Sequence, residues 1–322
     1  MIASQLIAGA SLLGLDIGGS TSRAWLASAD GTVILRATAP SASLAAASRQ
    51  QAESVISALL ANVGLETPAA PLLDAICVGT AGSGAAEVVS WVVERFSPMV
   101  RQPARERIAV VNDSRLALAA EGLDSGIAII AGTGSTAIGV LGEREERAGG
   151  WGYLLGDDGS GYWVVREAVR QLCLRRDEGQ AAGALGDTLF EGAGATDTLD
   201  LIQRFHEDPA PARWATLAPA VLDSQDPAAE TILAASAEAL AALVTQVAER
   251  LHHPPPVPIV IAGGLVVNHA ALGEATVNAI VARLGAAGDA TKLDVRLSAR
   301  PPIEGALHLA EALARGFDGH EG

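Results

Sequence analysis

The sequence predicts an α/β protein built from two similar halves. Apolar segments of strand length alternate with longer segments of helical spacing along most of the 322 residues, a pattern typical of sheets covered by helices on both faces. Residues 12–28 read as strand, glycine-rich turn and strand, and residues 127–141 repeat this order. With 49% hydrophobic residues, the chain is large enough to bury a core in each of two lobes.

The first half opens with a predicted meander of three strands separated by glycine-containing turns. After it, helical periodicity and short apolar runs alternate. In chain order we expect strands at 12–16, 23–28 and 32–38, a helix at 43–62, a strand at 75–80, a helix at 85–96, a strand at 107–111, and a helix that begins at Asp113 or Ser114.

The second half restarts at Gly126 and contains a long glycine-rich loop. A polar stretch rich in alanine and glycine reaches to about Asp197, and we assign no element to it. The triple proline from Pro254 should stop the preceding helix, because proline lacks an amide hydrogen and disfavours helix before it. In chain order we expect strands at 127–131 and 136–141, the loop at 149–161, helices at 162–175, 198–205 and 228–251, a strand at 257–262, a helix at 271–284, a strand at 293–298 and a helix at 303–315.

Charge and composition exclude several classes of partner. The net charge is −15, whereas a protein that binds nucleic acid needs clustered Lys and Arg to neutralise phosphates. Lys292 is the only lysine, and no GxxxxGK[ST] motif occurs, so a Walker-type nucleotide site is excluded. The partner is therefore expected to be small, and any nucleotide must be held in another way.

The cysteines and the N-terminal segment favour the cytoplasm. Cys77 and Cys173 are too far apart in sequence for a CxxC pair, and two cysteines make no disulfide framework. Residues 1–15 are apolar but lack the basic residues of a secretory signal, and the apolar run is too short to span a bilayer. We expect this segment to lead into a buried first strand, with no membrane partner.

The first turn is a candidate phosphate site. Glycines without a Cβ let backbone N–H groups converge on a phosphate. An acid at the end of the strand could lie beside that phosphate if Mg²⁺ stands between them, usually through water. The structural alternative is an ordinary tight turn. The predicted phosphate ligands are Gly18, Gly19, Ser20 and Thr21, and the predicted metal ligand is Asp16.

The second turn occupies the equivalent place in the second half. Gly132, Thr133, Gly134 and Ser135 follow a predicted strand just as the first turn does. Two opposed turns could hold one triphosphate between them. The alternative is a duplicated fold in which both turns are merely structural.

Asn112 and Asp113 follow the strand at 107–111. Phosphoryl transfer to an alcohol needs little covalent help, but a positioned carboxylate can accept the proton of the attacking hydroxyl. Asp113 is a candidate for that base. The alternative is that Asp113 is the N-cap of the next helix, where aspartate commonly accepts a backbone N–H.

Two glycine-containing segments of the second half complete the candidate set. The loop at 149–161 combines glycines, carboxylates and an aromatic side chain, which suits hydrogen bonds to sugar hydroxyls and cover over an apolar ring face. The strand before Gly263 and Gly264 ends in paired glycines that would let a flat base approach the backbone. A surface loop and a routine strand-to-helix turn are the structural alternatives.

The segment from Gly149-Gly150-Trp151-Gly152 to Gly156-Asp157-Asp158-Gly159-Ser160-Gly161-Tyr162-Trp163 resembles the GGWG…GDEGS-x-YW signature of the N-acetylglucosamine and glucosamine kinases and the BadF/BadG-type ATPases, with Asp158 in place of Glu. The two turns are similar to the phosphate motifs of the actin, Hsp70 and hexokinase superfamily, and residues 259–264 to its adenosine motif. The resemblance covers nearly the whole chain in order. It implies a duplicated ribonuclease H-like (actin-like ATPase) fold with two lobes around a nucleotide cleft.

The resemblance also implies roles for individual residues. It implies that Asp113 is the catalytic base and that the adenosine contacts Gly263 and Gly264. Many relatives carry an Asn on the loop after the third strand, where this chain has Ser43. The implied sugar contacts are Ser43, Asn112, Asp113, Gly150, Trp151 and Asp157.

The resemblance further implies a division into lobes. Residues 1–118 would form the N-terminal lobe and residues 119–302 the C-terminal lobe. A closing helix that contains Gly305-Ala306-Leu307, within residues 303–322, would return to pack on the N-terminal lobe.

The expected function is ATP-dependent 6-phosphorylation of an amino sugar, with N-acetylglucosamine as the first choice and Mg²⁺ as cofactor. Glucosamine is an alternative substrate, and an ATPase switch or sugar sensor of the same superfamily is an alternative class. A reductase-activating ATPase would need cysteines to hold an iron–sulfur cluster, and the isolated Cys77 and Cys173 do not supply an evident set. A zinc-containing sugar kinase would need a Cys-rich loop, which this sequence lacks. A homodimer is included among the expected assemblies.

Overall fold

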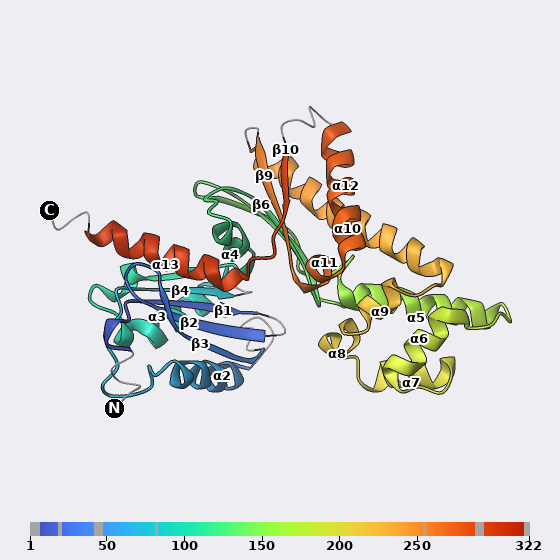
Figure 1. Cartoon of the computed structure of the whole chain (residues 1–322), viewed down its shortest axis with the longest axis horizontal. Coiled ribbons are helices and arrows are strands. Elements are labelled where there is room, and N and C mark those ends of the chain that lie inside the picture. Colours follow the sequence, from blue (N-terminus) through green and yellow to red (C-terminus); the bar gives the residue numbers. More distant parts are fainter. Residues whose placement is uncertain are drawn as a thin grey trace. The chain divides into compact units, whose positions relative to one another are not determined.

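The computed structural model describes residues 7–18, 21–41, 48–80, 83–253, 256–286 and 293–318. The chain divides into two compact units, shown in Figure 1. Unit 1 comprises residues 1–124 and 300–322, and unit 2 comprises residues 125–299. The expected lobe boundary after residue 118 would cut helix α4 (Asp113–Ala120), which instead belongs wholly to unit 1 because it packs against the closing helix.

Unit 1 contains a five-stranded sheet in the order β3-β2-β1-β4-β5. The first three strands pair antiparallel, and β4 and β5 add in parallel. Its elements are η1 (Ile7–Gly9), β1 (Leu12–Ile17), β2 (Thr21–Ala27), β3 (Val33–Pro40), α2 (Arg49–Asn62), β4 (Ala75–Thr80), α3 (Ala86–Phe96), η2 (Ser97–Met99), η3 (Ala104–Arg107), β5 (Ile108–Val111), α4 and α13 (Pro302–Asp318). The helix expected at 43–62 begins at Arg49, where Ser48 is the N-cap, and residues 42–47 lie outside the described residues.

Helices cover both faces of this sheet, which is why every residue of β1 and β4 is buried. On the face of α4 and α13, two strand glycines allow the helices to approach closely. A Cβ at Gly14 would lie 3.1 Å from Ala306, and a Cβ at Gly79 would lie 2.2 Å from Leu116. The closing helix α13 therefore packs directly on β1, β4 and α4 in unit 1, as Figure 1 shows.

Unit 2 repeats the same topology. Its sheet order, β8-β7-β6-β9-β10, has three antiparallel strands followed by two parallel ones. Its elements are β6 (Gly126–Ala131), β7 (Ser135–Leu141), β8 (Arg144–Gly149), α5 (Gly161–Asp177), α6 (Gly183–Ala193), α7 (Thr198–Glu207), α8 (Pro211–Ala215), α9 (Ala218–Leu222), α10 (Pro227–Leu251), β9 (Val257–Ala262), α11 (Gly264–Asn268), α12 (Ala270–Ala286) and β10 (Leu293–Leu297).

The largest difference between the two units is the segment between the third and fourth strands of each sheet. Among the residues that the structure describes, unit 1 has one helix there, α2, and unit 2 has six, α5 to α10. The sequence pattern missed α6, because its residues are largely small, and it missed β8, a mostly exposed strand rich in charged residues. It also missed the short helices α8, α9 and α11.

Helix α10 is the core helix of unit 2. Among the described helices it alone is long and apolar enough to cross a membrane by length and composition. It packs instead against α12, α5 and strands β6 to β8, as a core helix of a globular domain does. The helix ends at Leu251 with His252 in the left-handed conformation (φ 51°), so it stops before the proline run.

Candidate functional site

In unit 1 the candidate site lies where β1 ends. Strand alternation puts Leu12, Gly14 and Asp16 on the face covered by α4 and α13. Asp16 is 5% exposed. A Cβ at Gly18 would lie 2.8 Å from the carbonyl oxygen of Thr21, so the turn closes too tightly for a larger residue. The predicted phosphate ligands Gly19 and Ser20 lie outside the described residues.

Asp16 faces a cation that the sequence analysis did not name. Arg23 is directly opposite Asp16 in the β1–β2 ladder, and its Nη1 lies 3.3 Å from Oδ2 of Asp16. The pKa of Asp16 is raised to about 6, chiefly by burial; Arg23 opposes the rise, and Asp113 adds to it. Asp113 therefore acts electrostatically on Asp16, so the two carboxylates share one local field.

The start of α4 separates the roles of Asn112 and Asp113. Asn112, not Asp113, is the N-cap, and its Oδ1 accepts the backbone N–H of Ser114 at 3.0 Å. Asp113 is the first helical residue, and its Oδ1 also accepts this N–H at 3.0 Å. A carboxylate at this position gains from the positive end of the helix dipole. The N-cap is therefore Asn112 and not Asp113, and the role of Asp113 as a base stays a prediction.

In unit 2 the second turn is tied to the glycine-rich loop. Ser135 Oγ donates to the carbonyl of Asp158 at 2.8 Å, and the N–H of Gly161 donates to the carbonyl of Gly132 at 2.8 Å. Ser160 caps α5 by accepting the N–H of Trp163 at 3.2 Å. Turn, loop and helix start thus form one hydrogen-bonded unit at the end of the sheet.

Asp157 lies at the centre of this assembly. It is a non-glycine residue in the left-handed region, with φ 60°, a conformation that costs energy and marks functional positions. Its carboxylate accepts N–H groups of Ser135 and Gly152, yet burial raises its pKa above the ordinary value. A Cβ at Gly134 would lie 2.7 Å from Oδ2 of Asp157, so this glycine is required by the carboxylate beside it.

The loop before Asp157 is more exposed. Trp151 is 63% exposed, and the guanidinium of Arg147 stacks over its ring at 4.8 Å. A Cβ at Gly150 would lie 2.9 Å from Oγ1 of Thr136, so the loop runs close to β7. Tyr153 packs edge-on against Tyr162 with ring centroids 5.1 Å apart. The predicted sugar contact Ser43 belongs to unit 1 and lies outside the described residues.

Close packing requires a glycine at position 263 but not at position 264, where a Cβ would have its nearest neighbour, Nδ2 of Asn268, at 3.8 Å. Gly263 has φ 107°, and a Cβ there would lie 2.3 Å from the carbonyl oxygen of Ala131. The end of β9 is therefore pressed against the end of β6. The amide nitrogen of Gly264 is 4.0 Å from the place of a Cβ at Gly132, which brings this predicted adenosine segment beside the second turn.

The acidic residues of unit 1 fit a hydrated Mg²⁺. Among the described residues no group of three or more His, Cys, Asp or Glu side chains could hold a metal, but Mg²⁺ keeps several waters and often uses one or two carboxylates plus substrate phosphates. Burial disfavours the charged form of Asp16 and so raises its pKa, and a nearby cation would offset that cost. Asp16 stays the predicted ligand of that ion, through water.

Two contributors escaped sequence reasoning for different reasons. Arg23 could have been found, because a hairpin closed at the first turn places it opposite Asp16. Ser236 on α10, whose hydroxyl donates to the carbonyl of Gly159 at 2.8 Å, lies 77 residues from its partner, and no local pattern marks it.

The duplicated topology of the two sheets, with a turn at the first hairpin of each, is that of the actin-like ATPases. Residues 13–299 match the family model described as the BadF/BadG/BcrA/BcrD ATPase family, and the chain belongs to this family.

This chain is similar in sequence to two named kinases and in structure to a further protein. An N-acetylmuramic acid/N-acetylglucosamine kinase of Clostridium acetobutylicum is 31% identical over 203 residues, 61% of this chain and 62% of that protein. An N-acetyl-D-glucosamine kinase of Dictyostelium discoideum is 31% identical over 189 residues, 55% of this chain and 57% of that protein. The matches therefore span about three fifths of each relative's length. The solved structure of a proposed N-acetylglucosamine kinase of Chromobacterium violaceum is similar at 27% identity with a TM-score of 0.68, covering 93% of this chain and 98% of that one.

Proposed function

We propose that this protein is an ATP-dependent kinase that phosphorylates the 6-hydroxyl of an amino sugar, with N-acetylglucosamine as the first candidate. The observation that carries this proposal is at the start of α4. Asn112 supplies the helix cap, while the adjacent Asp113 carboxylate shares a local field with the buried Asp16. A binding protein without catalysis has no need of such a carboxylate.

In the proposed reaction the sugar O6 attacks the γ-phosphorus of ATP. Asp113 accepts the proton of the hydroxyl as the new P–O bond forms, and the bond from the γ-phosphorus to the bridging oxygen breaks to release ADP. Most of the catalysis would come from positioning and charge stabilisation. Unit 1 contributes Asp113 and the turn at Gly18 and Thr21, with Gly19 and Ser20 predicted to complete it.

Unit 2 contributes the second phosphate turn and the sugar loop. Gly132, Thr133, Gly134 and Ser135 would bind phosphate, Gly263 and Gly264 would line the adenosine site, and Asp157 would accept sugar hydroxyls, with Gly150 and Trp151 beside it. The pKa of Asp157 is raised by burial, so a hydroxyl donor from the sugar would stabilise its charged form.

Mg²⁺, when bound, would neutralise charge on the β- and γ-phosphates. Asp16 is proposed to hold its water shell. Arg23 already balances part of the Asp16 charge, which fits indirect coordination better than direct coordination.

The choice of substrate rests on the names of the relatives and on the signature loop. Glucosamine is the alternative sugar, because Ser43 stands where an Asn is common in related kinases and a shorter side chain leaves the C2 contact open. An ATPase switch or sugar sensor is the alternative class. The cytoplasmic location and the homodimer stay predictions of the sequence.

The test is ADP release with Mg·ATP in the presence of N-acetylglucosamine, glucosamine, glucose, N-acetylmannosamine or no sugar, with the phosphorylated position read by NMR. Strong stimulation by one amino sugar with phosphate on O6 supports the proposal. ATP hydrolysis that is indifferent to every sugar contradicts it and favours the switch alternative.

A further inference from the structure

We infer that Ser236, a buried residue of α10, is a positioning residue for the sugar site. Its hydroxyl donates to the carbonyl of Gly159 at 2.8 Å, and both partners belong to unit 2. Ser236 is fully buried. The inference rests on the proposed role of Asp157 as a sugar ligand and names the residue that holds the loop carrying it.

The contact between α10 and the loop is close along the backbone as well. Gly159 has φ 80°, and a Cβ there would lie 2.7 Å from the carbonyl oxygen of Ser236 and 2.9 Å from Leu240. No larger residue fits between the loop and the helix. The backbone of the loop therefore lies directly against α10, where the Ser236 hydroxyl donates to the carbonyl of Gly159.

Two successive carbonyls of the loop are held from opposite sides. Ser135 on β7 donates to the carbonyl of Asp158, and Ser236 on α10 donates to the carbonyl of Gly159. Together with the bond from the N–H of Gly161 to the carbonyl of Gly132, these two hydroxyls hold the loop in which Asp157 has the left-handed conformation with φ 60°. Releasing one carbonyl lets the peptide rotate, and the carboxylate of Asp157 then loses its fixed direction.

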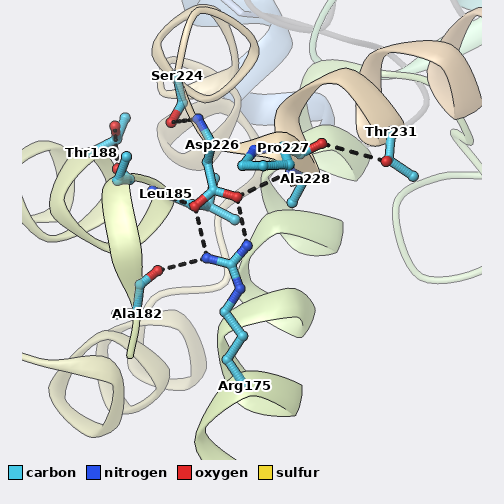
Figure 2. A network of polar contacts seen from close by, with 10 residues as sticks. Arg175, Ala182, Leu185, Thr188, Ser224, Asp226, Pro227, Ala228 and Thr231 are labelled. Atoms are coloured by element: carbon cyan, nitrogen blue, oxygen red, sulfur yellow. Dashed lines mark hydrogen bonds and ion pairs between the residues drawn. The ribbon is translucent and has the colours of Figure 1, made fainter. Parts of the chain in front are cut away.

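The position of α10 relative to the loop is itself fixed by an ion pair, shown in Figure 2. Arg175, near the end of α5, binds Asp226 through two bonds of 2.8 and 2.5 Å. Asp226 is the N-cap of α10, accepting the N–H of Ala228, and it also accepts the N–H of Leu185 at 3.2 Å. Arg175 donates in addition to the carbonyl of Ala182 at 2.8 Å.

This pair joins the two helices that meet at the loop. Helix α5 starts at the loop, where Ser160 is its N-cap, and reaches the ion pair at Arg175. Helix α10 starts at the ion pair and passes the loop at Ser236, about 15 Å further along at 1.5 Å per residue. The two helices and the ion pair thus form a frame that sets where the Ser236 hydroxyl meets Gly159.

The experiment measures kcat and KM for the sugar and for ATP in Ser236→Ala, Asp157→Ala and the double variant. Ser236→Ala should raise the sugar KM about tenfold, the scale of one lost hydrogen bond to a buried group, and change the ATP KM less than about twofold. Because Ser236 acts through Asp157, the double variant should have the sugar KM of Asp157→Ala alone.

Thr245→Ala is the matched control. Thr245 is on the same helix, and its hydroxyl donates to the helix's own carbonyl at Ala241 (2.9 Å), so losing it should leave both KM values unchanged. Ser236→Cys keeps the volume with only a weak donor and is measured as well, in case Ser236→Ala does not fold. Its sugar KM should also rise.

The outcomes separate the sugar-ligand role of Asp157 from the positioning role of Ser236. If Asp157→Ala leaves the sugar KM unchanged, the sugar-ligand role of Asp157 fails. If Asp157→Ala raises the sugar KM but the folded Ser236 variants do not, or if the two effects multiply in the double variant, the positioning role of Ser236 is overturned while the sugar-ligand role stands.

Discussion

The two units use the same hairpin turn in different ways. In unit 1 the turn stands beside charge: the buried Asp16, its partner Arg23 and the nearby Asp113. In unit 2 the turn is hydrogen-bonded to the loop from Asp157 to Gly161. The carboxylate beside this turn, that of Asp157, comes from the loop, because the strand itself ends in Ile130 and Ala131. One topology thus supports a site whose acid is on the first strand in one copy and on a later loop in the other.

The closing helices differ as well. Helices α4 and α13 follow the last strand of their respective sheets, yet both pack in unit 1, against each other. Helix α13, which follows the last strand of the unit 2 sheet, thus belongs to unit 1. Unit 1 is therefore covered on this face by α4 and α13, whereas the sheet of unit 2 is contacted by the inserted helix α10 and by α12.

The largest expected effect is on catalysis by Asp113 in unit 1. Asp113→Asn should lower kcat by about 10²- to 10⁴-fold, the range for losing a positioned general base, while the KM values for ATP and sugar change less than about threefold. Steady-state ADP release measures all three. A variant that keeps near wild-type kcat would remove Asp113 from the mechanism and weaken the contrast between the units.

In unit 2, Asp226→Ala should lower the free energy of unfolding by about 3 kcal/mol, because it leaves Arg175 without its partner and α10 without its cap. Arg175 lowers the pKa of Asp226. The stabilisation is therefore present above the ordinary aspartate pKa of about 3.9 and is lost as the pH falls below it.

Denaturant titration of wild type and Asp226→Ala at several pH values checks this. The exposed pair of Asp208 and Arg213 is the control, since Asp208→Ala should cost less than about 1 kcal/mol. Equal costs for the two variants would contradict the frame role of the buried pair.

Gly305→Ala tests whether α13 belongs to unit 1 by close packing. A Cβ at Gly305 would lie 2.0 Å from the carbonyl oxygen of Leu116 and 2.8 Å from the N of Ala120, so the variant should lose about 2 to 3 kcal/mol. At Gly316, on the same helix, no atom lies within 4 Å of a Cβ. Gly316→Ala should instead gain up to about 1 kcal/mol from helix propensity. Thermal melts of both variants decide, and a neutral Gly305→Ala would refute the close packing.

Asp16→Asn tests the cost of charge in unit 1. The pKa of Asp16 is raised to about 6, so its contribution to stability is full below the ordinary pKa and is lost as the pH rises through about 6. Asparagine does not titrate, so the variant does not lose this stability as the pH rises. Relative to wild type, the variant should therefore gain on the order of 2 kcal/mol between about pH 4 and pH 7.5.

Thermal melts without ligand at both pH values measure that gain. Asp30→Asn is the control in the same unit, because the pKa of Asp30 is lowered by its hydrogen bond from Ser28 and its trend with pH has the opposite sign. A gain for Asp16→Asn that does not depend on pH would show that Asp16 is not held at a cost in its charged form.

The smallest expected effect is on the sugar KM, through the second turn in unit 2. Gly134→Ala places a methyl 2.7 Å from Oδ2 of Asp157, so the carboxylate must shift, and the sugar KM should rise about tenfold. Gly132→Ala has its nearest neighbour at 4.0 Å and should affect the ATP KM instead. Equal effects of both variants on the sugar KM would erase the distinction between phosphate turn and sugar loop.

Much of the fold could be predicted from local pattern. The two meanders, the strands at 75–80 and 257–262 and the helices around 86–96 and 227–251 were predicted within a few residues, because buried strands and long helices carry strong periodicity. Helix α6 and strand β8 could not, since one is rich in small residues and the other is largely exposed. The start of α2 was misplaced because Ser48, a cap, looked like one more helical residue.

By itself the sequence determined the duplicated α/β order, the family signature from Gly149 to Trp163 and the candidate acids, because these depend on residue type and short spacing. Only the tertiary structure decided that Asn112 and not Asp113 caps α4, that Arg23 faces Asp16, and that Gly263 is needed against Ala131. It also revealed Ser236, whose partner is 77 residues away. Such contacts arise where elements pack, and packing distance does not follow from distance along the chain.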